Sequence, residues 1–328
     1  MSEGIGASIT RKEDKKFLTG KGRYTDDINR AGQVYAHFVR SDVAHANIKS
    51  IDIKAASAAS GVVAVYTGED VAADGIGGPI CGWVVPNRDG SAMHEPPHPL
   101  LAQGKVRFVG DAVAVVIAET VEQAKSASEL VEVEYDELPA VANLETASSG
   151  AEIHEGVAKN TYFDWELGDE AATAKALESA AKVVKLTVRN NRLIPNAMEP
   201  RCALAEYDEL ADSYTLHTTS QNPHLTRLVL AAFMFQIPES KLRVVAPDVG
   251  GGFGSKIYVY IEESVCVWAS KKLKRPIKWT ADRTQSFLTD AHGRDHVNNV
   301  QLALDDKNKI IGLRVDTICN LGSYLSAF

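Results

Sequence analysis

Short apolar runs dominate the first half of the chain, and their lengths are those of β-strands rather than of helices. Four of these runs predict strands, at Val34–Val39, Val62–Tyr66, Ala112–Ala118 and Val131–Tyr135. The run at 112–118 is almost continuously apolar, which is typical of a strand buried on both faces. A helix is predicted at Val121–Leu130, because Thr120 and Gln123 have the spacing of a capping box at its start.

The second half mixes predicted helices with predicted strands. Helices are expected at Glu170–Ala181, Pro223–Phe235 and Tyr258–Lys272. Strands are expected at Val183–Val188, Cys202–Tyr207, Tyr214–Thr219, Leu242–Ala246, Asn298–Leu304 and Ile310–Ile318. The start of the middle helix is the best defined, because Asn222 suits the N-cap and Pro223 the first helical position.

This order of elements predicts an α+β protein, and a length of 328 residues favours two domains. The polar stretch Ser148–Gly150 is the predicted linker, which gives domains at residues 1–147 and 151–328. Within the first domain, the segment Pro79–Pro99 is rich in proline and is predicted to be a long irregular loop. Such loops in compact domains are usually functional or mobile.

The segment Val249–Lys256 has the strongest chemical signature, with four glycines around Phe253. Glycine can adopt positive φ and lets backbone N–H groups approach a ligand closely, so the loop suits a flat, anionic ligand. It is not a P-loop, because Ser255 separates Gly254 from Lys256, and its glycine spacing does not match the dinucleotide-binding pattern either. A flexible surface turn is the alternative interpretation of this loop.

Composition excludes several classes of function. The net charge of −8 argues against a nucleic-acid surface, and no apolar run approaches the roughly 18 residues of a membrane helix. The N-terminus has no pattern of a secretory signal. The four cysteines are scattered without a CxxC pair, so an iron–sulfur cluster or structural zinc held by this chain alone is not expected. We therefore expect a cytoplasmic protein with reduced thiols.

Several motifs, in order, resemble the molybdopterin-binding large subunit of the xanthine dehydrogenase, aldehyde oxidase and aerobic carbon monoxide dehydrogenase family. The resemblance covers nearly the whole chain. It rests on Arg11–Ile28, Phe108–Ala118, Glu129–Val141, Met198–Arg201, Ser220–His224, the glycine loop, Arg275–Trp279, His292–His296 and Asn320–Leu325. The resemblance implies an a/b hammerhead domain followed by the first, incomplete molybdopterin-binding α/β domain.

The resemblance also implies a site and its cofactor. Gln221 would donate a hydrogen bond near an oxo ligand of molybdenum, and Phe253 would narrow the approach of the substrate. Gly251, Gly252 and Gly254 would lie with them against the pterin, expected in its cytosine dinucleotide form. The implied reaction is the oxidation of carbon monoxide, an aldehyde or an N-heterocycle with water as oxygen source. Iron–sulfur and FAD centres would belong to small and medium partner subunits.

Family members are more than twice as long, and their base glutamate would lie beyond Phe328. The resemblance therefore implies a truncated product, a split subunit completed by another chain, or an incomplete gene model, inactive without the missing part. A non-catalytic assembly module is the alternative function. Without the glycine loop, Gln221 would be interpreted as a polar residue flanking a helix.

Two further pairs of residues have alternative interpretations. Glu199 and Arg201 are candidates for an interior ion pair near the site, or for a structural role at the entry of a strand. His292 and His296 have the spacing of helical metal ligands, but Gly293 between them argues against a helix.

Overall fold

The computed structural model describes residues 4–326, and its centre is a mixed seven-stranded sheet. In spatial order the strands are β10 (Leu242–Val245), β9 (Ser213–Thr218), β8 (Cys202–Asp208), β11 (Ile277–Thr280), β1 (Val34–Arg40), β5 (Ala112–Ala118) and β3 (Val62–Thr67). The pairs β10–β9 and β1–β11 are parallel, and the other neighbours are antiparallel. The sheet thus joins both halves of the sequence, and a domain boundary at 148–150 stays a prediction.

Helices cover both faces of this sheet and bury its apolar side chains. On one face α7 (Ile261–Leu273) packs against β8, β9 and β11, and its cluster includes Val115 and Ile117 of β5. On the other face Val116 packs against Ala127 of α4 (Val121–Ser128). Every residue of β5 is buried, so the prediction of a strand covered on both faces is confirmed.

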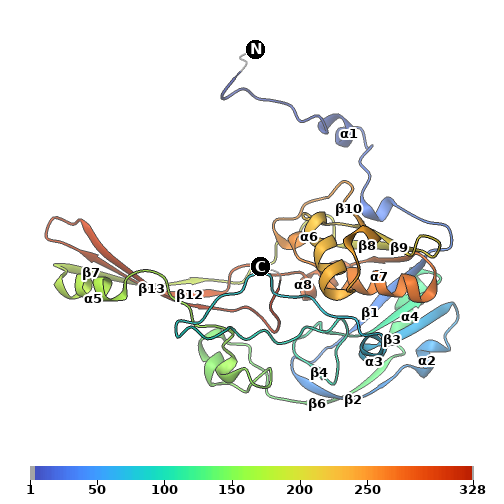
Figure 1. Ribbon diagram of the computed structural model, residues 1–328, viewed down its shortest axis with the longest axis horizontal. Coiled ribbons are helices and arrows are strands. Elements are labelled where there is room, and N and C mark those ends of the chain that lie inside the picture. The colour runs from blue at the N-terminus through green and yellow to red at the C-terminus, as the bar shows by residue number, and fades with distance from the viewer. Residues whose placement is uncertain (1–3, 327–328) are drawn as a thin grey trace.

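Two smaller sheets flank the centre. One consists of β4 (Lys105–Val106), β2 (Ala46–Asp52) and β6 (Glu132–Glu137). The other consists of β13 (Ile310–Cys319), β12 (His296–Leu304) and β7 (Lys182–Asn190), with α5 (Glu170–Ser179) against it. Figure 1 shows this second sheet projecting from the body of the molecule, at the end opposite α4.

The remaining helices are short: α1 (Asp14–Leu18), α2 (Lys54–Ser57), α3 (Gly68–Ala73), α6 (Pro223–Leu228) and α8 (Arg283–Thr289). The helix predicted from Pro223 continues past α6 as a π-helical turn, Val229–Met234. Residues 79–99 contain no helix or strand, as expected. None of the helices among residues 4–326 combines the length and apolarity needed to cross a membrane.

The structure also corrects the prediction in several places. The elements β2, β11 and α8 were not predicted from the sequence, and α7 begins at Ile261 instead of Tyr258. Only half of the predicted capping box forms on α4. The Thr120 hydroxyl accepts a bond from the backbone N–H of Gln123, at 3.2 Å. The Gln123 side chain lies over Gly61 instead, where an added Cβ would come within 2.2 Å of it.

A buried charge cluster connects the central sheet to α7. Arg201, just before β8, donates to Glu262 at 2.7 and 3.2 Å and to Asp290 at 2.6 Å. Arg40, at the end of β1, donates to the same Glu262 carboxylate at 2.7 Å. Glu262 is only 1% exposed and Arg201 2%. The prediction of an ion pair between Glu199 and Arg201 is therefore wrong, because both acidic partners of Arg201 lie elsewhere in the chain.

The protonation of Glu262 follows from these contacts. Burial alone raises the pKa of a carboxyl group, because it disfavours the charged form. Here the guanidinium groups of Arg201 and Arg40 outweigh burial and lower the pKa of Glu262 to about 2. The carboxylate therefore stays charged between its two arginines.

Replacing Glu262 by Gln should strongly destabilise the fold, because two arginines would lose a shared counter-charge in the interior. Removing one partner of a buried ion pair typically costs about 3–5 kcal/mol. Urea denaturation measures the loss. The matched control is Glu263→Gln, at a neighbouring buried carboxyl group whose pKa is raised by burial and which binds Thr218. A loss as large in the control would contradict a special role for Glu262.

Stability should also depend on Glu262 at acid pH. The pKa of this group is lower in the folded chain, about 2, than its ordinary value of 4.5. Its stabilising contribution is thus complete above about pH 4.5 and declines as pH falls toward 2. We expect the difference in unfolding free energy between wild type and Glu262→Gln to shrink over this range. A difference that does not change between pH 6 and 3 would contradict the assignment.

Candidate functional site

The sheet topology brings the two predicted site segments together. Gln221 follows β9 and the glycine loop follows β10, and these two strands are parallel neighbours. The carboxyl ends of parallel strands meet at one edge of a sheet, which is where α/β folds usually bind ligands. The backbone N–H of Gln221 donates to the carbonyl of Lys256 at 2.8 Å, so the segments are in direct contact.

The Gln221 side chain is oriented by the loop itself. Its Oε1 accepts a bond from the backbone N–H of Gly254 at 3.0 Å. Because a backbone N–H can only donate, the amide atom that contacts Gly254 must be the oxygen. The NH₂ group of Gln221 is therefore the part of the amide that does not contact Gly254. No described residue accepts from that NH₂ group. A Cβ at Gly252 would come within 2.3 Å of Oε1, so a larger residue there would displace the Gln221 amide.

The loop presents Phe253 rather than burying it. Phe253 is 77% exposed and has a φ of +50°. The left-handed conformation costs a non-glycine residue roughly 1–2 kcal/mol, and such strain commonly occurs at functional sites. Gly251 and Gly254 on either side also have positive φ, at +99° and +87°. The loop therefore presents the Phe253 ring to solvent.

Lys256 and Glu199 bind both ends of the loop from its buried side. Lys256 is 2% exposed, and its Nζ donates to the Glu199 carboxylate at 3.0 Å and to the Glu199 carbonyl at 2.8 Å. The same carboxylate accepts from the N–H of Gly250 at 2.6 Å. Burial lowers the pKa of Lys256, and the hydrogen bond that its ammonium group donates to Glu199 opposes that shift. Glu199 thus forms an interior ion pair with Lys256.

A second carboxylate fastens the loop to the N-terminal arm. Asp248 lies two residues before Gly250 and accepts from Lys16 Nζ at 2.5 Å and from the backbone N–H of Arg23 at 2.8 Å. Its own N–H donates to the carbonyl of Arg23 at 3.1 Å. These roles of Asp248, Glu199 and Lys16 as supports of the loop were not predicted from the sequence. Asp248 and Glu199 lie next to the glycine run and within the Met198–Arg201 motif, respectively, and Lys16 lies within the Arg11–Ile28 motif.

Tyr260 connects this loop to the buried charge cluster. Its hydroxyl donates to the Ser255 carbonyl at 2.6 Å and accepts from the N–H of Ala291 at 2.9 Å. The guanidinium of Arg201 lies 3.7 Å from the centre of the Tyr260 ring. The position of the loop therefore depends on the same interior charges as the sheet.

His292 and His296 do not form a metal site. His292 contacts the carbonyl of Phe287, whereas His296 is the first residue of β12. His98 instead stacks on Tyr324 with ring centroids 4.0 Å apart, and burial lowers its pKa to about 4. Among residues 4–326, no group of three or more His, Cys, Asp or Glu side chains is placed to hold a metal ion.

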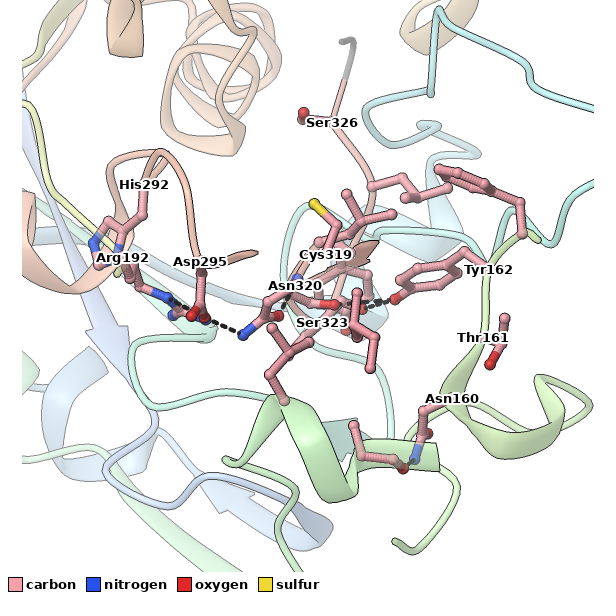
Figure 2. A pocket seen from close by; sticks show the side chains of 18 of the residues that line it. Asn160, Thr161, Tyr162, Arg192, His292, Asp295, Cys319, Asn320, Ser323 and Ser326 are labelled. Atoms are coloured by element: carbon pink, nitrogen blue, oxygen red, sulfur yellow. Dashed lines mark hydrogen bonds and ion pairs between the residues drawn. The ribbon is translucent and has the colours of Figure 1, made fainter. Parts of the chain in front are cut away.

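A cavity of about 1600 Å³ lies beside β13 and the segment 140–170. Figure 2 shows Arg192, Asp295 and Asn320 linked on one side of it. Asp295 accepts from Arg192 at 3.2 Å and from Asn320 at 2.7 Å. Neither Gln221 nor the glycine loop lines this cavity. The candidate cofactor site is therefore the loop edge, where Gln221 contacts the glycine loop, and not this cavity.

Two family models match the chain. Residues 19–139 match the a/b hammerhead domain of aldehyde oxidase and xanthine dehydrogenase, and residues 153–328 match the molybdopterin cofactor-binding domain. The fold predicted from the sequence, a hammerhead domain followed by part of a molybdopterin-binding domain, is thereby confirmed.

Individual relatives of the chain are proteins of the same family. The chain is 33% identical over 320 residues to the nicotine 6-hydroxylase large subunit of Paenarthrobacter nicotinovorans. It is 36% identical over 340 residues to the carbon monoxide dehydrogenase large chain of Hydrogenophaga pseudoflava. Each match covers 98% of this chain but only 38% and 40% of the relative, so the chain spans about two-fifths of their length.

A solved structure superposes on nearly the whole of this chain. The crystal structure of quinoline 2-oxidoreductase from Pseudomonas putida 86 superposes with a TM-score of 0.90 at 36% identity, over 98% of this chain and 40% of that one. The match therefore includes both the hammerhead part and the loop edge. This chain belongs to the molybdopterin-binding family of aldehyde oxidases and xanthine dehydrogenases.

Proposed function

We propose that this chain is the cofactor-holding part of a molybdenum hydroxylase large subunit, and that the loop edge around Gln221 holds molybdopterin with molybdenum. The observation that carries the proposal is the fixed orientation of the Gln221 amide. Its oxygen is held by Gly254, which leaves its NH₂ group free to donate to an oxygen atom of the bound group.

The rest of the site is compatible with an oxygen-rich, anionic group. The backbone N–H groups of Gly251, Gly252 and Phe253 donate to no described residue, and they are consecutive. Consecutive backbone N–H groups in a glycine-rich turn form a concave anion site. The positively charged Lys256 lies beneath the loop but is paired with Glu199. The donors that face outward are therefore neutral and directional.

The residues of this chain would bind and orient rather than transfer protons. Neither Gln221 nor Phe253 titrates, so neither serves as a general acid or base. When bound, the molybdenum–pterin group supplies the oxidation chemistry that side chains cannot perform. Gln221 would fix that group by a hydrogen bond, and the exposed ring of Phe253 would limit which substrates approach it.

The finer assignments are part of the same proposal. We infer a cytosine dinucleotide form of the pterin, and partner subunits that carry the iron–sulfur and FAD centres. We infer a substrate that is carbon monoxide, an aldehyde or an N-heterocycle, since the names of the similar proteins include carbon monoxide, nicotine and quinoline. A separate chain that supplies the remaining three-fifths of the subunit is part of the same proposal.

The direct test is the cofactor content of the chain, purified with its associated proteins from molybdenum-replete cells. We expect about one molybdenum per chain, and acid hydrolysis should release cytidine monophosphate. Release of guanosine monophosphate instead would reject only the cytosine form. A chain in its native complex that contains neither molybdenum nor pterin would reject the proposal and favour the assembly module.

Replacing Gln221 by Ala should remove a donor aimed at the bound group. Loss of one pre-placed donor in a catalytic site typically costs about 2.7–4 kcal/mol, or roughly a hundred- to thousand-fold in turnover. The measurement is turnover of the complex at matched molybdenum content. The control is Cys266→Ala, a fully buried position in α7 that should change stability only. Near-normal turnover of Gln221→Ala would reject the site.

Replacing Phe253 by Ala should change substrate choice more than turnover. The ring is exposed and makes no hydrogen bond, so its loss should widen the approach to the site and leave Gln221 in place. We expect KM and the ratio of kcat/KM between small and bulky substrates to shift by about tenfold, or roughly 1.4 kcal/mol. A fall in kcat with unchanged substrate preference would contradict this role.

A further inference from the structure

The short segment Asn196–Met198 lies against the first half of the glycine loop. Glu199, the next residue, donates its backbone N–H to the Gly250 carbonyl at 3.1 Å. Its carboxylate accepts from the N–H of Gly250 at 2.6 Å. A Cβ at Gly251 would lie 3.4 Å from the Cβ of Ala197. The position of this segment therefore decides where the first half of the loop lies.

The segment cannot fix its own conformation. Residues 194–201 belong to no helix or strand, so no ladder of backbone hydrogen bonds holds them. Asn196 has a φ of +52°, a left-handed conformation that costs free energy in a residue other than glycine. The side chain of Met198 is 88% exposed and contributes little packing. A support from another part of the chain is required.

Arg283, the first residue of α8, is that support. Its Nη1 donates to Asn196 Oδ1 at 2.5 Å and to the Ala197 carbonyl at 2.8 Å. Its Nη2 donates to the Met198 carbonyl at 3.0 Å. These acceptors are all neutral, and Arg283 forms no ion pair with any residue in the range 4–326. The guanidinium therefore binds the shape of the segment, because its planar fork fixes several acceptors at once.

The helix that carries Arg283 is itself fixed at both ends. At its start Asp282 accepts from the backbone N–H of Gln285 at 2.7 Å, as an N-cap does. Just after its end Asp290 accepts from buried Arg201 at 2.6 Å. Ser286, within the helix, is fully buried. The buried charge cluster therefore also determines where the Arg283 guanidinium lies.

We infer that Arg283 is a positioning residue for the proposed cofactor site. It fixes the segment Asn196–Met198, and Glu199 passes that position to the glycine loop. This inference rests on the proposed function, since the loop matters chemically only if it holds the bound group. A lysine at this place would keep the charge but would lose the planar fork, so geometry and charge can be tested separately.

The test compares Arg283→Ala and Arg283→Lys with wild type, each purified in its native complex. The matched control is Arg275→Ala. Arg275 also makes three side-chain hydrogen bonds, to the Gly32 carbonyl and to both carboxylate oxygens of Glu119, but none of them leads to the loop. Hydrogen exchange of residues 250–254 is measured on complexes from cells grown with and without molybdate. Thermal unfolding, molybdenum content, kcat and KM are measured on the same preparations.

We expect exchange of residues 250–254 to become about tenfold faster in Arg283→Ala, or roughly 1.4 kcal/mol in the free energy of opening. Arg283→Lys should fold like wild type and still exchange faster, whereas the control should exchange at the wild-type rate. In the molybdenum-loaded complex, kcat of Arg283→Ala should fall about ten- to hundred-fold with KM nearly unchanged, because misplaced groups weaken the chemical step.

Wild-type exchange in Arg283→Lys would overturn the inference, because charge alone would then suffice. So would equally fast exchange in Arg275→Ala, which would indicate a general loss of stability. The proposed function fails separately. Faster exchange of the loop in Arg283→Ala, in complexes that contain no molybdenum under any growth condition, would reject the cofactor and still support Arg283 as the residue that positions the loop.

Discussion

The shared carboxylate of Glu262 is the interaction on which the rest of this structure depends. It lies between Arg40, which ends β1, and Arg201, which precedes β8, and it belongs to the first turn of α7. Three elements that are distant in the sequence are thereby held at one point inside the protein. Charges taken out of water are tolerated only with close partners, so this geometry has little freedom.

The position of the candidate site depends on that charge cluster. Arg201 lies against the ring of Tyr260, and the Tyr260 hydroxyl holds the carbonyl of Ser255 at the end of the glycine loop. The other supports of the loop are also carboxylates, Glu199 and Asp248. Charged groups therefore lie below the loop, where they are paired, and neutral donors lie on it. This separation lets the loop face an anionic group without an unpaired charge of its own.

The protein thus has two surfaces with opposite chemistry. The loop edge offers backbone N–H groups and one amide, which suit oxygen atoms. The projecting sheet offers two rows of aliphatic side chains, which suit another apolar surface.

The sequence by itself determined the elements whose local pattern is strong. The continuous apolar run of β5, the Asn222–Pro223 helix start and the glycine loop were predicted from neighbouring residues and are present. It did not reveal β2, because a shift in register between Ile48 and Ser50 breaks the alternation on which strand prediction depends. It also did not reveal β11.

Only the tertiary structure decided the partners of the charged residues. Glu199 and Arg201 are two positions apart in the sequence, but one binds Lys256 and the other binds Glu262 and Asp290. The orientation of Gln221 likewise depends on Gly254, 33 residues away. Local patterns report which residues are buried or turn the chain. The choice between several possible counter-charges depends on strand pairing across the whole sheet, and pairing is a property of the fold.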